Sequence, residues 1–304
     1  NRQTGSSFKP FVYATALELG YSSQDMILDE PYCLNIAGSG EWCPSNYDNR
    51  FHGRVTLTEA LAKSYNIPAV KVSESVGRDL VRKVASDFGI VSDLADGPAL
   101  ALGASESTLL EMSGAYAGIL NGGSSVTPYG LVELRLLGQD EPLMGTGGGI
   151  GERVIRQEAA QELTYMMYRV VNGGTGARAQ LPGREAAGKT GTTQAARDAW
   201  FLGFTADYVA GVWMGYDDNT PLTGVTGGGL PSEIWHEVMV RVHEGLPARP
   251  LPMIRVRERP VDEGFGVGGG TGQQDRPAQQ QRPARQDDRN RPIENILRKL
   301  LGGG

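Results

Sequence analysis

Three short stretches of the sequence carry residue types that could perform acyl-transfer chemistry. In the first, Ser6-Ser7-Phe8-Lys9, the serine Ser6 and the lysine Lys9 are three residues apart and would share one face of a helix. A serine becomes a nucleophile when a base removes its proton, and a lysine can be that base if burial or a neighbouring cation lowers its pKa. By itself the stretch favours a simpler interpretation, a helix-capping serine followed by a solvated lysine.

The other two stretches offer polar groups that could bind a peptide. Ser64-Tyr65-Asn66 places a hydroxyl and an amide two positions apart at a break between predicted helices, although a capping serine and a turn asparagine would fit there too. Lys189-Thr190-Gly191-Thr192 combines a cation, two hydroxyls and a glycine that allows close backbone approach. Such a set suits a strand edge that binds a carboxylate, and an ordinary exposed strand is the alternative.

The helices that must position these stretches are predicted from hydrophobic periodicity. A first helix is expected over residues 6–19, with Ser6 as its cap and Pro10 in its first turn. Further helices are expected over residues 56–64, 68–77, 77–89, 107–123, 156–174 and 231–245. In the last of these, the inward face is predicted to hold Ile234, Trp235, Val238, Met239 and Val242.

Strands are predicted mainly in the later part of the chain. Residues 21–55 are expected to be loop, and residues 129–140 a strand followed by a turn. An extended stretch over 185–193 precedes a predicted hairpin of two aromatic and β-branched strands, 199–205 and 208–216. Helices followed by a strand cluster predict a mixed α/β (α+β) fold in which the elements pack in layers.

Composition limits the function classes. The chain has 304 residues, 39% of them hydrophobic, which is enough for the core of one large or two small domains. Its formal net charge of -6, without a basic face, gives no indication of nucleic-acid binding. No stretch approaches the about 18–20 apolar residues of a membrane span. We expect a folded domain over residues 1–250 and a disordered Gly/Gln/Arg/Pro-rich tail over 251–304, ending in a short weak helix.

Two cysteines, Cys33 and Cys43, stand ten positions apart around a glycine- and serine-containing loop. They could form a disulfide in an oxidising compartment, and two unrelated thiols would fit the spacing equally well. His52 is the one other zinc-ligand side chain that the sequence places nearby, so no metal site is expected. No cofactor is predicted either.

The order S-x-x-K, S-x-N, K-T-G is the motif set of penicillin-binding proteins and serine β-lactamases. On these motifs and on longer stretches, the sequence resembles the transpeptidase domain of class A penicillin-binding proteins of the 1A type, the bifunctional peptidoglycan synthases. The longer stretches are RQTGSSFKPFVYATALE, NYDNRFHGRVTLTEALAKSYNIPAVKV, ALGASESTLLEMSGAYAGILNGG, AAGKTGTTQAARDAWFLGFT, GVWMGYDDN and GGGLPSEIWHEVM. Together they cover roughly residues 1–245.

The resemblance implies a fold and a reaction. The fold is a mainly antiparallel central sheet flanked by helices on both faces. The reaction is that of a D,D-transpeptidase, in which Ser6 attacks the carbonyl between the last two D-alanines of a peptidoglycan stem peptide. D-Alanine leaves, and an amine of a neighbouring stem peptide resolves the acyl-enzyme. Lys9 would be the base for Ser6, and Ser64 would relay a proton between Lys9 or Lys189 and the leaving amine.

The remaining site residues receive binding roles from the same resemblance. Asn66 would hydrogen-bond the substrate backbone and orient the catalytic lysine of the first motif. Lys189 would supply positive potential, while Thr190 and Thr192 would hold the terminal carboxylate. The backbone N–H groups of Ser6 and Thr192 would form the oxyanion hole, in which a single donor is worth about 3–4 kcal/mol of barrier.

Partners and location also follow from the resemblance. It implies stem peptides as substrates, covalent inhibition by β-lactam antibiotics, the cell-wall synthesis machinery as a partner, and the periplasmic face of the bacterial inner membrane. Two strands of the sheet, a glycosyltransferase domain and a membrane anchor would precede this chain. A serine β-lactamase and a penicillin-sensing domain share the three motifs and stay as alternatives. No E-x-x-x-N-type deacylation loop is evident between residues 100 and 180, and the wider resemblance favours the synthase.

Overall fold

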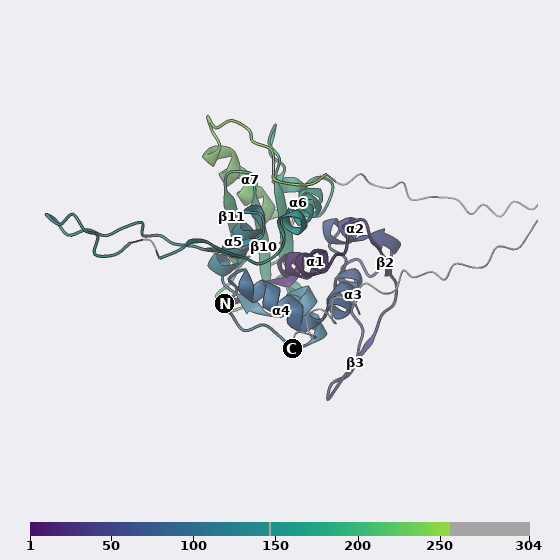
Figure 1. Cartoon of the computed structure of the whole chain (residues 1–304). Helices are drawn as coiled ribbons and strands as arrows, with labels where there is room; N and C mark the ends of the chain where they lie inside the picture. Colours follow the sequence, from purple (N-terminus) through teal and green to yellow (C-terminus); the bar gives the residue numbers. More distant parts are fainter. Residues whose placement is uncertain (146, 256–304) are drawn as a thin grey trace, which may run out of the picture. The chain divides into compact units, whose positions relative to one another are not determined.

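A three-stranded antiparallel sheet, in the order β11–β10–β9, lies at the centre of the fold (Figure 1). The computed structural model describes residues 1–145 and 147–255. The strands are β9 (Ala187–Thr192), β10 (Asp198–Phe204) and β11 (Val209–Gly215). Trp200 in the central strand lies opposite Gly191 on one side and Trp213 on the other. The predicted hairpin and the extended stretch before it are therefore confirmed.

Helices form where the hydrophobic periodicity predicts them. They are α1 (Lys9–Glu18), α2 (Leu57–Ala62), α3 (Asn66–Val76), α4 (Arg78–Asp87), α5 (Leu109–Leu120), α6 (Gln157–Val171) and α7 (Leu230–Val242). Short 3-10 turns occur at η1 (Gly5–Phe8), η2 (Pro98–Leu102), η3 (Ala177–Ala179) and η4 (Gln194–Ala196). The prediction that Ser6 caps the first helix is wrong, because Ser6 lies inside η1 and no side chain caps α1.

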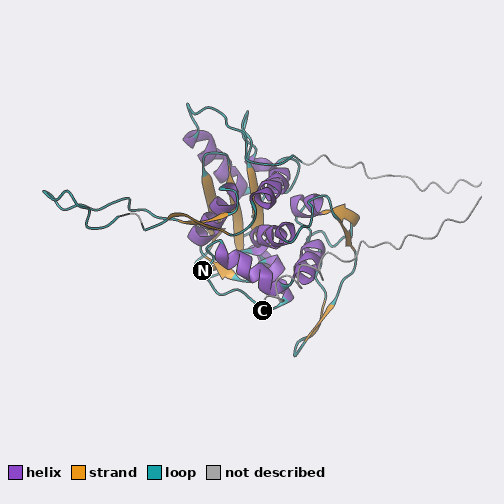
Figure 2. Ribbon diagram, viewed as in Figure 1, coloured by secondary structure: helices purple, strands orange, loops and turns teal. Residues whose placement is uncertain are grey.

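Helices cover both faces of the sheet (Figure 2). Trp200, Leu202 and Phe204 of β10 belong to the larger core, which they share with residues of α1 and α5. Phe201 points to the opposite face, where its ring centroid lies 5.2 Å from that of Trp235 in α7. Burial on both faces explains why this strand is a nearly continuous apolar run. The predicted mixed α/β architecture, with helices on both faces of an antiparallel sheet, is confirmed.

The prediction that residues 21–55 form a loop is wrong, because the segment contains two short antiparallel pairs. The pairs are β2 (Met26–Asp29) with β5 (Gly53–Thr56), and β3 (Leu34–Ile36) with β4 (Gly40–Trp42). A further pair joins β1 (Arg2–Gln3) to β6 (Glu106–Ser107). Each of these strands has two to four residues, which is too short for a period-2 pattern to stand out from the surrounding turn residues.

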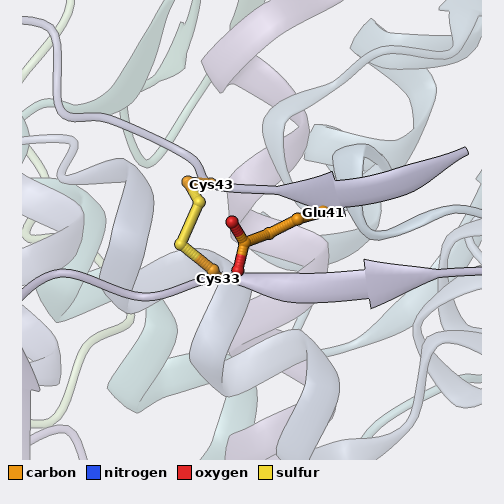
Figure 3. Close-up of side chains that lie close together, drawn as sticks. All are labelled: Cys33, Glu41 and Cys43. Atoms are coloured by element: carbon orange, nitrogen blue, oxygen red, sulfur yellow. A yellow bond between two sulfur atoms is a disulfide. The ribbon is translucent and has the colours of Figure 1, made fainter.

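A disulfide closes the hairpin of β3 and β4. Cys33 and Cys43 are joined by an S–S bond of 1.99 Å, and Figure 3 shows Glu41 beside the bridge. The spacing allowed either a disulfide or two unrelated thiols, and the structure shows the disulfide. Because both sulfurs are committed to the bridge, they cannot act as thiolate ligands, and this cluster of three side chains is not a metal site.

The predicted strand over residues 129–140 is not formed. The neighbouring strands are β7 (Ser124–Thr127) and β8 (Gly149–Arg153), and the segment between them carries a single isolated bridge from Leu134 to Met144. Figure 1 shows this segment extending away from the sheet and the helices. Leu136 and Leu137 are exposed there, so the apolar pattern that suggested a strand has no face against which to pack in the described part of the chain.

The predicted inward face of α7 is right for two of its five residues. Trp235 and Met239 are buried against the sheet, whereas Ile234, Val238 and Val242 stay 37–45% exposed. The apolar face of α7 is wider than the stripe that contacts the sheet, since residues one position apart differ by about 100° around a helix.

The chain stays attached to the domain beyond the predicted boundary at residue 250. Leu251 is buried, and its N–H donates to Glu185 Oε2 at 2.9 Å. The N–H of Ile254 donates to Gln161 O at 3.2 Å, and Arg255 forms an ion pair with Glu185. Residues 251–255 therefore pack on the domain. The rest of the predicted tail, with its terminal helix, lies outside the described residues.

Two truncated chains should distinguish the contribution of residues 251–255 to stability from that of residues 256–304. We expect removal of residues 256–304 to leave Tm nearly unchanged, because their composition supplies little apolar surface to bury. Removal of residues 251–304 should lower Tm by about 4–8 °C, since burying a leucine is worth about 2 kcal/mol and 1 kcal/mol shifts Tm by about 2–4 °C in a domain of this size. Calorimetry on both chains measures the difference, and Leu251→Ala in the longer chain should reproduce part of it. Equal Tm values for the two truncations would contradict this expectation.

Candidate active site

The structure brings the three chemically promising stretches together where η1, the junction of α2 and α3, and strand β9 meet. The hydroxyl oxygen of Ser64 lies 3.3 Å from Lys9 Nζ and 2.8 Å from Lys189 Nζ. The two lysines come from positions 55 and 125 residues away from this serine in the sequence. One hydroxyl therefore connects two lysines that are far apart in the sequence and that only the fold brings close together.

The turn that carries Ser6 rests directly on strand β9. A Cβ atom on Gly191 would lie 2.5 Å from the carbonyl oxygen of Thr4, and one on Gly5 would lie 2.8 Å from the carbonyl oxygen of Thr192. Both distances are too short for a real side chain, so this backbone contact requires glycine at both positions. Ser6 follows Gly5 in the turn and is partly accessible to solvent, which suits a nucleophile at the edge of the strand.

Hydrogen bonds from separate parts of the chain fix η1 in place. They join Gly5 N–H to Gly103 O at 3.1 Å, Trp200 Nε1–H to Gln3 O at 2.8 Å, and the Tyr116 hydroxyl to Ser7 O at 2.7 Å. Gly103 has a φ of 70°, in the left-handed region that favours glycine. No local sequence pattern marks these residues as supports of the turn, although Gly103 and Tyr116 both lie in the stretch ALGASESTLLEMSGAYAGILNGG that carries the family resemblance.

Lys9 is fully buried, and its ammonium group is surrounded by oxygen atoms of the second motif. Besides the Ser64 hydroxyl, Nζ contacts Ser64 O at 2.6 Å, Tyr65 O at 3.1 Å and Asn66 Oδ1 at 2.7 Å. Burial, followed by the positive charge of Lys189, holds the pKa of Lys9 well below its usual range. A lowered pKa makes the amine of a lysine easier to deprotonate, which is what a general base requires.

Lys189 is also fully buried, on the strand that faces η1. Burial lowers the pKa of Lys189 to about 7. Its Nζ donates to the Ser64 hydroxyl and to Thr190 O at 3.0 Å. Near neutral pH, Lys189 therefore exists in both protonation states, so it can supply positive charge or exchange a proton with Ser64.

Ser64 occupies an unusual backbone conformation. Its φ of 61° lies in the left-handed region, which is uncommon for a residue other than glycine. The residue stands between the end of α2 and the start of α3, and its carbonyl oxygen accepts the 2.6 Å hydrogen bond from Lys9. Strain of this kind persists only where the surroundings hold it, and it clusters at functional sites.

Asn66 is the first residue of α3, and its side chain is held at both ends. Oδ1 accepts from Lys9, and Nδ2 donates to Ser45 O at 2.7 Å. The backbone N–H of Asn66 donates to Asn46 Oδ1 at 2.8 Å. The orientation of Lys9 by Asn66, which the resemblance implied, has a direct contact in the structure.

The two threonines of the third motif lie on one face of β9 and have partners that the sequence did not suggest. Thr190 Oγ1 lies 2.8 Å from Thr175 Oγ1, and Thr192 Oγ1 accepts a hydrogen bond from Gly227 N–H at 3.0 Å. Thr175 belongs to the glycine-rich turn after α6. The Gly-Thr-Gly sequence around Thr175 predicts a turn at that point. Nothing in the sequence indicates that this turn contacts Thr190.

Comparison with known proteins identifies the family. The penicillin binding protein transpeptidase domain family matches residues 1–239. This chain belongs to that family. The match includes all three motifs and ends within α7, so it spans nearly all of the elements described above.

Curated relatives agree with this assignment. Penicillin-binding protein 1A of Neisseria lactamica is 34% identical over 264 residues, a match that covers 83% of this chain and 33% of the relative. Penicillin-binding protein 1A of Pseudomonas aeruginosa is 30% identical over 311 residues and is covered to 37%. The chain thus spans about a third of the length of these relatives. Both are penicillin-binding proteins, so they give no support to the β-lactamase or sensor alternatives.

Solved structures show the same fold. Penicillin-binding protein 1A from Haemophilus influenzae superposes with a TM-score of 0.74 at 29% identity, covering 82% of this chain and 43% of that one. The PonA1 protein from Mycobacterium tuberculosis, in complex with penicillin V, has a TM-score of 0.74 at 26% identity and covers 84% of this chain and 73% of that one. The transpeptidase fold that the resemblance implied is confirmed.

Substituting Gly191 should separate η1, the turn that carries Ser6, from the edge of β9. In Gly191→Ala the added Cβ would meet the Thr4 carbonyl at 2.5 Å, so η1 or β9 must shift. We expect acylation by a penicillin to slow by about 10- to 100-fold, because a displacement of about 1 Å can cost 10²-fold in rate. Gly97→Ala is the matched control, since a Cβ there meets no atom within 4 Å and the φ is -80°. A Gly191→Ala rate within threefold of the parent would contradict the role of this contact.

Removing the buried amine of Lys189 should change stability in a pH-dependent way. Because the folded-state pKa of about 7 lies below the usual 10.5, the folded chain binds fewer protons than the unfolded chain between these values. Stability contributed by this group therefore falls as pH decreases from 10.5 to 7. Lys189→Met lacks this cost, so its gain in stability over the parent should be at least about 1 kcal/mol larger at pH 7 than at pH 10, given about 1.4 kcal/mol per pKa unit.

Thermal melts of both chains across this pH range measure the difference. The exposed lysine Lys83 provides the matched control, since Lys83→Met removes an amine that is not buried. The hydrogen bonds that Lys189→Met loses shift its stability by a similar amount at every pH, so only the slope is diagnostic. The slope is that of the stability difference between variant and parent against pH. If it were the same for Lys189→Met and Lys83→Met, burial would not penalise the protonated amine of Lys189.

Proposed function

We propose that this domain is a serine D,D-transpeptidase that cross-links peptidoglycan stem peptides and is acylated by β-lactam antibiotics. The observation that carries the proposal is the Ser64 hydroxyl, which lies within hydrogen-bonding distance of two buried lysines. Ser6 stands one helical turn before one of these lysines, and its turn is in backbone contact with the strand of the other. These contacts support a site made of Ser6 as the nucleophile, two lysines and Ser64 as proton-transfer groups, and a cationic strand edge.

In the first step, the hydroxyl oxygen of Ser6 attacks the carbonyl carbon between the last two D-alanines. Lys9, which enters the step as a neutral amine, accepts the hydroxyl proton as the new C–O bond forms. Negative charge then develops on the carbonyl oxygen. The backbone N–H groups of Ser6 and Thr192 are the proposed donors to this oxygen, in line with the backbone contact between η1 and β9.

In the second step, the C–N bond breaks and terminal D-alanine leaves as a neutral amine. Its nitrogen needs a proton, and Ser64 can deliver one because its hydroxyl lies beside both lysines. The D-alanine carboxylate lies against Lys189, Thr190 and Thr192, whose cation and hydroxyls favour an anion. An amine of a second stem peptide then attacks the acyl-enzyme, forms the cross-link and restores Ser6. Attack by water instead would give D-Ala-D-Ala carboxypeptidase activity.

β-Lactam inhibition follows from the same geometry. A penicillin offers a strained amide carbonyl to Ser6 and a carboxylate to the cationic strand edge. Ring opening leaves the amine attached to the acyl group, so the leaving group cannot diffuse away. The PonA1 relative was solved in complex with penicillin V, which supports β-lactam binding by this chain.

We propose that the domain acts outside the cytoplasm, at the periplasmic face of the bacterial inner membrane, where its proposed substrate would be cross-linked. The disulfide between Cys33 and Cys43 supports an oxidising compartment. Among residues 1–145 and 147–255, no helix has the length and apolarity that crossing a bilayer demands. In a protein as long as the 1A relatives, we propose that the membrane anchor, a glycosyltransferase domain and contacts with the cell-wall synthesis machinery reside in other segments.

Labelling with a fluorescent penicillin tests this proposal. The 304-residue chain should take up one label, and peptide mass spectrometry should locate it on Ser6. Ser6→Ala should abolish labelling, whereas the matched control Ser86→Ala, an exposed serine of α4, should label normally.

Lys9→Arg should fold, as checked by circular dichroism, and acylate at least about 10²-fold more slowly, because arginine cannot act as a base. A label on Ser64, or a folded Lys9→Arg chain within threefold of the parent, would overturn the assigned roles.

A further inference from the structure

Residues 44–52, here called the support loop, contact the Ser64–Tyr65–Asn66 motif directly. Ser45 O accepts from Asn66 Nδ2 at 2.7 Å, and Asn46 Oδ1 accepts from the Asn66 N–H at 2.8 Å. The ring of His52 stacks on the ring of Tyr65, with centroids 3.9 Å apart and planes at 15°. The motif is therefore held from outside its own helix.

Asn46 is buried, and its orientation is fixed by its partners. Nδ2 donates to both carboxylate oxygens of Asp29, at 2.8 and 3.0 Å, and to Arg50 O at 2.8 Å. A carboxylate can only accept hydrogen bonds, so the NH2 group of Asn46 must face Asp29. The amide oxygen then necessarily faces the first N–H groups of α3, which lack partners within the helix.

Asp29 is a fully buried carboxylate for which the proposed mechanism has no use. Besides Asn46, it accepts from the backbone N–H of His52 at 3.0 Å and lies 2.7 Å from His52 Nδ1. The other ring nitrogen of His52 lies 3.1 Å from Asp48. A buried charge is costly unless it is hydrogen-bonded, so Asp29 holds Asn46 and His52 strongly in one arrangement. The charge thus acts as a rigid anchor beneath the motif.

From these contacts we infer that Asn46, anchored by Asp29 and His52, is a positioning residue for acyl transfer. It fixes the start of α3, and with it the Asn66 oxygen that accepts from Lys9 Nζ. The same anchored residues contact Tyr65 and Asn66, the two residues that directly follow Ser64. The inference rests on the proposed transpeptidase function and deepens it, since Asn46 touches neither the substrate nor the reacting atoms.

Exchanging the two anchored side chains provides the test. Asn46→Asp would place two carboxylates in contact, and Asp29→Asn would remove the charge that orients the amide. The double variant Asp29→Asn/Asn46→Asp again pairs one amide with one carboxylate. We expect each single variant to slow acylation of Ser6 by fluorescent penicillin about tenfold or more, since small misplacements carry such costs, and the double variant to recover at least part of the loss.

Rates are compared at a temperature well below each Tm, so that the folded fraction is near one in every sample. Val81→Ala, in the buried face of α4, lowers stability without touching the support loop and should acylate like the parent. A merely structural role predicts parent-like rates for all folded variants and would overturn the inference. So would a double variant that folds but acylates more slowly than both single variants.

Two further results keep the outcomes distinct. If the double variant does not fold, His52→Phe decides, because it keeps a ring against Tyr65 while removing the contact from Nδ1 to Asp29. It should slow acylation about threefold or more, as expected for a small displacement, and a parent-like rate would overturn the inference. If the parent chain is labelled at Ser6 and the single variants acylate at the same rate, the positioning role alone is overturned. An unlabelled parent overturns both this role and the proposed function.

Discussion

Two fully buried lysines that share one serine hydroxyl impose the main constraint on this structure. A buried ammonium group is costly unless it is hydrogen-bonded, and two of them repel each other. The structure responds by surrounding Lys9 with three oxygen acceptors besides the Ser64 hydroxyl and by lowering the pKa values of both Lys9 and Lys189. The condition that disfavours the charged form is the one that makes a lysine available as a base near neutral pH. Burial of the two lysines is therefore the cause both of the loss in stability and of the availability of a lysine as a base.

Close backbone contacts fix the turn that carries Ser6, the proposed nucleophile. The turn η1 approaches β9 so closely that neither Gly5 nor Gly191 could carry a side chain, and Gly103 lies equally close behind Gly5. These contacts need no side-chain flexibility, so they hold Ser6 more rigidly than a set of long polar side chains could. The sheet supplies the rigid wall, since β9 is paired along its length with β10. Packing on both faces of the sheet thus determines where Ser6 lies.

Much of this arrangement could be predicted from the sequence, because the relevant signals are local. Apolar periodicity located the helices, and the run AWFLGFT located β10 because a strand buried on both faces is apolar throughout. The motif set and the family resemblance selected Ser6, Lys9, Ser64, Asn66 and Lys189. The structure joins the last four by hydrogen bonds, and the turn that carries Ser6 lies against β9. The positive φ of Ser64, the contact of Thr175 with Thr190 and the anchor at Asp29 could not be predicted. The last two join residues 15 to 23 positions apart in the sequence, and neither residue type nor periodicity encodes such a contact.

The amide of Asn66 shows how support and substrate binding can coexist in one side chain. Its oxygen accepts from Lys9, and one hydrogen of Nδ2 is donated to Ser45 O. An amide nitrogen carries two hydrogens, so a second donor is left for a substrate carbonyl without breaking either contact. The role that the resemblance implied, binding substrate while orienting Lys9, is therefore stereochemically self-consistent. It requires that the helix start be held by another residue, since the side chain of Asn66 is committed to the site. The support loop supplies that hold through Asn46, which binds the backbone of Asn66 and leaves its side chain to the chemistry.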